Sequence, residues 1–163
     1  MIVVRKNILT LNDISYSCSI GKNGLSNDKI EGDGCTPLGK YSLGSIYYRN
    51  DKVALPNIDL KQIPIVKSYG WCDDIKSDDY NSLINFPFKY SAEKLFRADD
   101  IYDIICVINY NLDPVIKGKG SAIFLHIAHD NYSGTEGCIA LKKNDLIQLL
   151  TKINSNTKIN IIN

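Results

Sequence analysis

Cys138 and His126 are the two residues of this 163-residue chain whose types and spacing suit nucleophilic chemistry. His126 lies near the end of an apolar, β-prone run over residues 121–128, and Cys138 follows Gly137 in a later loop. A thiolate attacks a carbonyl carbon only when a neighbouring group removes the thiol proton and holds the sulfur in place. We therefore expect neutral His126 to serve as the base and to depress the pKa of Cys138. Backbone N–H groups near Gly137 and Cys138 should face the developing oxyanion, because glycine lets the backbone turn tightly there.

Two structural alternatives and one metal site compete with this interpretation. A lone cysteine is usually a small buried hydrophobe, and a lone histidine at a strand end is usually a satisfied polar residue. A zinc site would need His126, His129 and Cys138 together, but alternation along a continued strand turns the two histidines to opposite faces. No fourth ligand with suitable spacing follows. The sequence therefore predicts neither a metal nor another cofactor.

The charge balance and the hydropathy pattern exclude two classes of protein. The chain has 19 Lys and Arg residues against 18 Asp and Glu residues, so there is no net basic field to hold nucleic acid. No run approaches the roughly 20 apolar residues that a membrane span needs. We therefore expect neither a nucleic-acid partner nor a membrane span.

The first residues and the cysteines predict the compartment. Residues 1–7 hold only a short apolar stretch before a charged pair, too short for the apolar segment of a secretory signal. The five cysteines are an odd number and include no C-x-x-C pair, which suits a reducing compartment. We expect a cytoplasmic protein, with the periplasm as the alternative if an export signal has been lost from this sequence.

The elements that must position Cys138 and His126 are mainly β-strands. Apolar, β-branched runs predict strands, and leucines and isoleucines at three- and four-residue spacing predict one good helix with Asn144 as its N-cap. Segments rich in Gly, Asn, Asp or Pro predict loops. The length suits a single domain over residues 1–163, mainly β with minor α and with a sandwich or barrel-like sheet. Strands are expected at residues 2–5, 14–20, 40–48, 101–110, 121–128 and 157–162, helices at 143–153 and 91–96, and loops at 21–33, 55–68 (with a short strand) and 70–90.

Four separated sequence blocks share their order and residue types with one enzyme family. The first is Glu-Gly-Asp-Gly-Cys-Thr-Pro-Leu-Gly-Lys-Tyr at residues 31–41, and the second is Gly-Trp-Cys-Asp-Asp at 70–74 with Asp-Tyr-Asn at 79–81. The third begins with Arg-Ala-Asp-Asp at 97–100, and the fourth runs from His126 to Thr-Glu-Gly-Cys-Ile at 135–139. Over about residues 14–150, this order resembles the L,D-transpeptidase (YkuD-type) catalytic domain, in a compact subgroup whose domain stands alone.

The resemblance implies an enzyme of bacterial peptidoglycan metabolism that acts on stem peptides. Cys138 would attack the carbonyl of the L-centre at an L,D peptide bond and form a thioacyl-enzyme, while a backbone carbonyl shortly after His126 orients the ring. Transfer to water would make the protein an L,D-carboxypeptidase that trims soluble muropeptides, as expected for a cytoplasmic enzyme. Transfer to an amine would make it a cross-linking L,D-transpeptidase. A non-catalytic binding domain for peptidoglycan fragments is the last alternative, because Glu136 and Ala140 depart from the family pattern.

Polar residues outside the catalytic pair predict contacts to a peptide substrate. Asp74 belongs to an acidic cluster at residues 73–79, which is either a solvated loop or a binding site for a cationic substrate group. Tyr80 and Asn81 follow the cluster and are expected to hydrogen-bond a peptide backbone.

Three further residues complete the predicted substrate contacts. The Arg97 guanidinium either binds a substrate carboxylate bidentately or forms a structural salt bridge with Asp99 or Asp103. Thr135 and Glu136 occupy motif positions next to Cys138, and the resemblance implies that both contact the substrate.

Overall fold

The computed structural model describes all residues from 1 to 163 and is built mainly from β-strands. Fourteen strands and one helix follow one another along the chain. Their bounds are β1 (Ile2–Arg5), β2 (Ile8–Leu11), β3 (Ile14–Ser19), β4 (Leu25–Ser26), β5 (Thr36–Pro37), β6 (Gly39–Tyr48), β7 (Gln62–Pro64), β8 (Tyr69–Cys72), β9 (Leu83–Asn85), β10 (Ala92–Lys94), β11 (Ile104–Ile108), β12 (Phe124–Ile127), β13 (Ile139–Leu141), α1 (Lys143–Leu150) and β14 (Lys158–Ile162).

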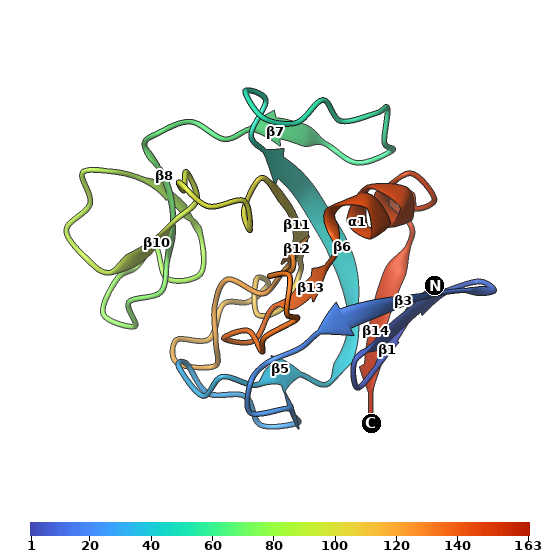
Figure 1. Cartoon of the computed structure of the whole chain (residues 1–163). Coiled ribbons are helices and arrows are strands. Elements are labelled where there is room, and N and C mark those ends of the chain that lie inside the picture. Colours follow the sequence, from blue (N-terminus) through green and yellow to red (C-terminus); the bar gives the residue numbers. More distant parts are fainter.

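The largest sheet closes on itself through its longest strand. Its order is β11-β12-β13-β3-β2-β1-β14-β6-β7, and β6 also pairs with β11. The first part of β6 pairs with β14, at Ser42 with Lys158, and the second part pairs with β11, at Tyr48 with Ile104. Figure 1 shows β6 as a long curved strand that spans these neighbours. Closure of the sheet through β6 leaves few free strand edges. The closed sheet confirms the predicted mainly β, barrel-like fold.

One face of this closed sheet carries the larger hydrophobic core. Side chains on a strand alternate between the two faces, so Ile123, Leu125 and Ile127 point together into this core. It contains 24 buried residues, among them Leu146 and Leu149 of α1. That helix is eight residues long, and no helix has the length and apolar character to cross a membrane.

The opposite face of β11 and β12 carries a second core under a small sheet. Phe124 points to this side, where the Trp71 ring meets it edge to face with ring centroids 5.2 Å apart. Trp71 belongs to a three-stranded sheet of order β10-β8-β9, drawn apart from the closed sheet in Figure 1. Strands covered on both faces are mostly apolar rather than alternating, and every residue of β11, β12 and β13 is buried, with His126 as the one strongly polar side chain.

Several local predictions are wrong, for identifiable reasons. The helix expected at 91–96 is strand β10, because pairing of Ala92 with Cys72 adds this segment to β8. The predicted loop at 70–90 contains part of β8 and all of β9, and the loop at 21–33 contains β4. The unpredicted β2 joins β1 and β3. The helix at 143–153 is confirmed but ends at Leu150, and its N-cap is Lys142, which makes no side-chain capping bond, rather than Asn144.

Candidate active site

Parallel pairing of β12 with β13 brings Cys138 and His126 to the same face of the sheet. Leu125 pairs with Ile139 and His126 with Ala140, so Cys138 stands opposite Phe124, two residues before His126. Positions two residues apart share a face of a strand. Cys138 and His126 consequently line one cavity of about 540 Å³, between the closed sheet and the small sheet. Other residues around it are Glu31, Gly32, Asp73, Glu93, Ile101, Tyr102, Ser121, Ala122, His129, Gly134, Thr135 and Glu136.

The Cys138 sulfur is held by two backbone groups. Its S–H donates to the carbonyl oxygen of Ala122 at 3.1 Å, and the sulfur accepts the N–H of Phe124 at 3.4 Å. Burial raises the pKa of the Cys138 thiol to about 12, with a smaller contribution from the nearby Glu93 carboxylate. The Phe124 N–H and Lys29 oppose this shift only in part. The expectation that His126 depresses the pKa of Cys138 is therefore wrong for the resting protein, in which the thiol is protonated.

The His126 imidazole is oriented by the next residue along the chain. Nδ1 lies 2.8 Å from the carbonyl oxygen of Ile127. A carbonyl only accepts, so Nδ1 carries the proton and Nε2 is the unprotonated nitrogen. Burial lowers the pKa of His126 to about 4, which keeps the ring neutral near pH 7. The predicted orienting carbonyl shortly after His126 is confirmed, and Nε2 is available as a base.

The turn before Cys138 leaves one backbone donor free. Gly137 has φ of +135°, and a Cβ at this position would lie 2.7 Å from the carbonyl oxygen of Cys35, so only glycine fits. The Gly137 N–H donates to Thr135 Oγ1 at 3.1 Å, whereas the Cys138 N–H makes no hydrogen bond within the protein. The Gly137 N–H is thus occupied. The N–H of Cys138 is the donor that remains for an oxyanion, and Gly137 contributes the conformation.

Three carboxylates form one wall of the cavity, and none has a Lys or Arg partner. We call Glu31, Asp73 and Glu93 the carboxylate wall. Glu93 accepts the hydroxyl of Tyr102 at 2.6 Å, and Asp73 has a buried oxygen without a hydrogen-bond partner. Burial raises the pKa of Glu93, the Tyr102 hydroxyl and the Arg97 charge oppose this in part, and the charges of Asp73 and Glu31 raise the pKa further. The wall therefore makes this side of the cavity anionic.

Two residues predicted to contact a peptide are buried behind the cavity instead. The Tyr80 hydroxyl donates to Glu31 and accepts the N–H of Gly120 at 3.0 Å. Asn81 Oδ1 accepts the indole N–H of Trp71 at 2.9 Å and the N–H of Ala122 at 3.0 Å. Neither side chain lines the cavity. The structure gives no support to the predicted backbone contacts of Tyr80 and Asn81, because the polar groups of both side chains fix the segment before β12.

Arg97 and Asp74 are also used by the protein itself. The Arg97 guanidinium binds both carboxylate oxygens of Asp99, at 2.8 and 2.6 Å, which matches the structural alternative. Asp74 accepts the N–H groups of Lys76 and Ser91, at 2.9 and 3.3 Å, and lies outside the cavity lining. The structure does not support a substrate contact for Asp74 or Arg97, since each already has its partners. The neighbour Asp73, not Asp74, faces the cavity.

The remaining predicted residues do lie at the cavity. Thr135 lines it and binds the turn, with its hydroxyl donating to the carbonyl oxygen of Cys138 at 2.6 Å. Glu136 lines the rim, where it is exposed and pairs with Lys22 at 2.6 Å. The expectation that His129 faces away from His126 is wrong: β12 ends at Ile127, so strand alternation no longer applies, and His129 lines the same cavity.

Sequence reasoning missed three cavity residues. Glu31 is the first residue of the 31–41 block, but no contact to the substrate was predicted for it. Glu93 was predicted to lie in a helix, and a helix at this position does not include the β10–β8 pairing that places Glu93 at the cavity. Tyr102 was one of ten tyrosines, and only the fold shows its ring 5.3 Å from that of His126.

Substitution of Glu93 by glutamine is expected to make Cys138 more reactive. Removing a negative charge near the sulfur favours the thiolate, and glutamine still accepts the Tyr102 hydroxyl. We expect alkylation of Cys138 by iodoacetamide at pH 8 to accelerate roughly threefold to tenfold, since one pKa unit changes the thiolate fraction about tenfold. Glu136→Gln, at the exposed rim, is the matched control and should leave the rate unchanged. Equal acceleration in both variants would contradict the effect of Glu93 on the thiol.

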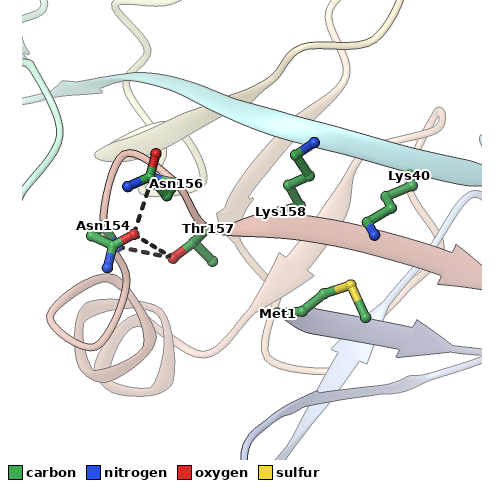
Figure 2. A pocket seen from close by; sticks show the side chains of 6 residues that line it. All are labelled: Met1, Lys40, Asn154, Asn156, Thr157 and Lys158. Atoms are coloured by element: carbon green, nitrogen blue, oxygen red, sulfur yellow. Dashed lines mark hydrogen bonds between the residues drawn. The ribbon is translucent and has the colours of Figure 1, made fainter.

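A second concavity lacks comparable chemistry. It has a volume of about 400 Å³ and is lined by Met1, Lys40, Asn154, Asn156, Thr157 and Lys158. Figure 2 shows Lys40 and Lys158 extending from neighbouring strands, while Asn154 bonds to Thr157 and Asn156 within one turn. No cysteine or histidine is present, so the Cys138 cavity is the candidate active site.

Comparison with known proteins agrees with the geometry. The family model described as YkuD, L,D-transpeptidase catalytic domain, matches residues 1–161, nearly the whole chain. No curated protein and no solved structure gives a match. The match spans both sheets and every residue of the candidate active site. The chain therefore belongs to the YkuD family of L,D-transpeptidase catalytic domains, enzymes that act on peptidoglycan peptides.

Proposed function

We propose that this protein is an L,D-carboxypeptidase that removes the terminal D-residue of a stem tetrapeptide through a thioacyl-enzyme on Cys138. The observation that carries the proposal is the placement of a thiol and a neutral, oriented imidazole on one cavity. The family supports a peptidoglycan peptide as the substrate.

The first half of the reaction transfers the acyl group to sulfur. His126 Nε2 takes the thiol proton while Sγ of Cys138 bonds to the carbonyl carbon of the L-centre, and the Cys138 N–H binds the resulting oxyanion. Collapse breaks the L,D peptide bond, and the leaving amine takes the proton from His126. Because the thiol pKa is about 12 and the imidazole pKa about 4, a thiolate–imidazolium pair is scarcely populated beforehand. Proton transfer is therefore coupled to attack on the bound substrate.

The second half decides between hydrolysis and cross-linking. Water attacks the thioester with His126 again as base, which releases the shortened peptide and the thiol. An attacking amine must be unprotonated, whereas an anionic surface stabilises its ammonium form. The carboxylate wall thus disfavours amines more than water, which supports the carboxypeptidase. Transpeptidation is the second candidate, because the wall also attracts ammonium-bearing peptides into the cavity.

Mass spectrometry of a disaccharide-tetrapeptide after incubation distinguishes the candidates. Loss of the terminal D-residue, with little exchange against an added D-amino acid, is the expected result. A cross-linked dimer or efficient exchange would favour the transpeptidase. Unchanged substrate that nevertheless binds would favour the non-catalytic binding domain. Cys138→Ser serves as the control that identifies turnover by this site.

We also propose that the substrates are soluble muropeptides in the cytoplasm. The supporting observation is that all five cysteines are free, which suits a reducing compartment. Cell fractionation tests this proposal, and recovery of the native protein from the periplasm would contradict it.

A further inference from the structure

Thr36 contacts the turn that carries Cys138 from the other end of the chain. Its side chain is fully buried. Thr36 Oγ1 donates to the carbonyl oxygen of Gly137 at 2.8 Å and accepts the N–H of Gly21 at 2.8 Å. With one donor and one acceptor contact, the hydroxyl orientation is determined by its surroundings. Thr36 therefore holds the Gly137 carbonyl in one direction.

The direction of that carbonyl sets the direction of the free backbone donor. The carbonyl of Gly137 and the N–H of Cys138 belong to the same planar trans peptide and point opposite ways. Holding the carbonyl against Thr36 therefore aims the Cys138 N–H away from it. Most backbone N–H groups of a folded protein are paired, yet this one, beside the cavity, has no partner in the protein. An unpaired donor next to the candidate nucleophile is suited to bind an oxyanion.

No other side chain holds this particular peptide. Thr135 binds the N–H of Gly137 and the carbonyl of Cys138, which belong to the peptides on either side. Gly137 is the residue with the greatest conformational freedom at this point. Without the Thr36 hydroxyl, the peptide between Gly137 and Cys138 loses its only side-chain anchor, and its orientation is less constrained.

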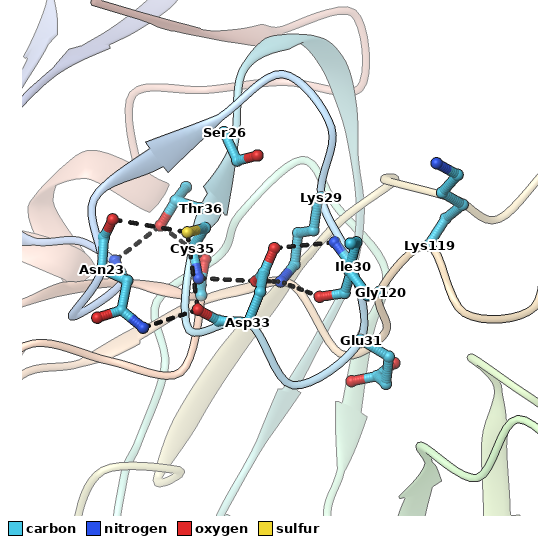
Figure 3. A network of polar contacts seen from close by, with 12 residues as sticks. Asn23, Ser26, Lys29, Ile30, Glu31, Asp33, Cys35, Thr36, Lys119 and Gly120 are labelled. Atoms are coloured by element: carbon cyan, nitrogen blue, oxygen red, sulfur yellow. Dashed lines mark hydrogen bonds and ion pairs between the residues drawn. The ribbon is translucent and has the colours of Figure 1, made fainter.

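The loop that presents Thr36 is held by a polar network of its own, shown in Figure 3. The carboxylate of Asp33 binds the buried Lys29 ammonium at 2.6 Å and the N–H groups of Ile30 and Cys35, each at 2.8 Å. Asn23 donates to the Asp33 carbonyl at 2.8 Å. The network explains how an exposed loop places one hydroxyl in a constant position.

We propose that Thr36 is a positioning residue that acts through the Gly137 carbonyl to aim the Cys138 N–H at the oxyanion. The inference rests on the proposed acyl chemistry. It predicts that Thr36 matters for attack on a carbonyl, which forms an oxyanion, and not for displacement at an alkyl carbon, which forms none.

Two reactions of Cys138 test the proposal in Thr36→Val and Thr36→Ser. Valine has nearly the same shape but no hydroxyl, whereas serine keeps the hydroxyl. Single-turnover acylation by the tetrapeptide or by a carbapenem should fall roughly 10²–10³-fold in Thr36→Val, as for loss of one oxyanion donor. Alkylation of Thr36→Val by iodoacetamide at pH 9 should stay within about twofold of the wild-type rate. Acylation of Thr36→Ser should lie within about tenfold of the wild-type rate.

Contrary outcomes separate the inference from the proposed function. Wild-type acylation in Thr36→Val, or parallel losses of acylation and alkylation, would overturn the positioning role. If Thr36→Val does not fold, Thr36→Ser alone tests the positioning role. Serine keeps the hydroxyl, so a loss of acylation by more than about tenfold in Thr36→Ser, with alkylation unchanged, would overturn that role. A wild-type protein that is alkylated at Cys138 but acylated by neither reagent would refute the proposed function and, with it, the inference.

Discussion

Replacing Cys138 with serine is expected to abolish release of the terminal D-residue from a stem tetrapeptide. A hydroxyl is far less acidic and less nucleophilic than a thiol, and the neutral His126 at this site is too weak a base to compensate. We expect a loss of at least about 10³-fold in kcat, comparable to removal of a nucleophile from other acyl-transfer enzymes. Rates are measured by mass spectrometry of the products under saturating substrate.

The fold of the Cys138→Ser variant should be intact. The serine hydroxyl is able to donate to the Ala122 carbonyl, which now accepts the thiol. Cys35→Ser is the matched control, because Cys35 is the only one of the five cysteines that is not buried, and its thiol donates only to carbonyl oxygens of its own loop. Activity in Cys138→Ser, or its loss in Cys35→Ser, would show that the wrong thiol has been assigned.

Replacing His126 with alanine is expected to lower kcat/KM by roughly 10²–10⁴-fold, the usual contribution of one general base. His129→Ala is the matched control. It removes an exposed ring from the same cavity and should lose much less, because His129 makes a side-chain hydrogen bond to no residue near Cys138. Equal losses in the two variants would mean that His129 is the base or that both rings are needed.

The pH profile gives an independent readout of His126. A base must be unprotonated to act, so kcat/KM falls as the pH drops through the pKa of the free enzyme's imidazole. Burial lowers that pKa from the ordinary 6.5 to about 4. Activity should therefore persist below pH 6 and decline only toward pH 4. A decline centred near pH 6.5 would show a solvated histidine. The double variant His126→Ala, Cys138→Ser should lose no more activity than Cys138→Ser alone, because the two residues act as a unit.

Much of the chemistry was predictable because it depends on residues close in sequence. Cys138 and His126 lie in one short stretch, where an apolar run ends in histidine and a glycine precedes the cysteine. The strands around residues 104–108 and 124–127 were also predictable, since long apolar, β-branched runs have few alternatives.

The tertiary structure alone decided which polar residues face the cavity. Asp73 and Asp74 are neighbours of the same type, yet only Asp73 lines it, because a turn uses the carboxylate of Asp74. Pairing of β10 with β8 places Glu93 at the cavity. The Thr36 hydroxyl, more than 100 positions away in sequence, holds the Gly137 carbonyl. Such contacts depend on strand order and loop closure, which local periodicity does not encode.

The sequence by itself determined the family, the mainly β class and the cysteine–histidine pair, because these follow from residue type, spacing and motif order. It did not determine the protonation state of that pair. Burial raises the pKa of Cys138 to about 12 and lowers that of His126 to about 4, so both groups are neutral at rest. Desolvation depends on what packs over the sheet, and here the small sheet of β8, β9 and β10 covers the face that carries both residues. The burial of both residues under this sheet is therefore a property of the tertiary structure.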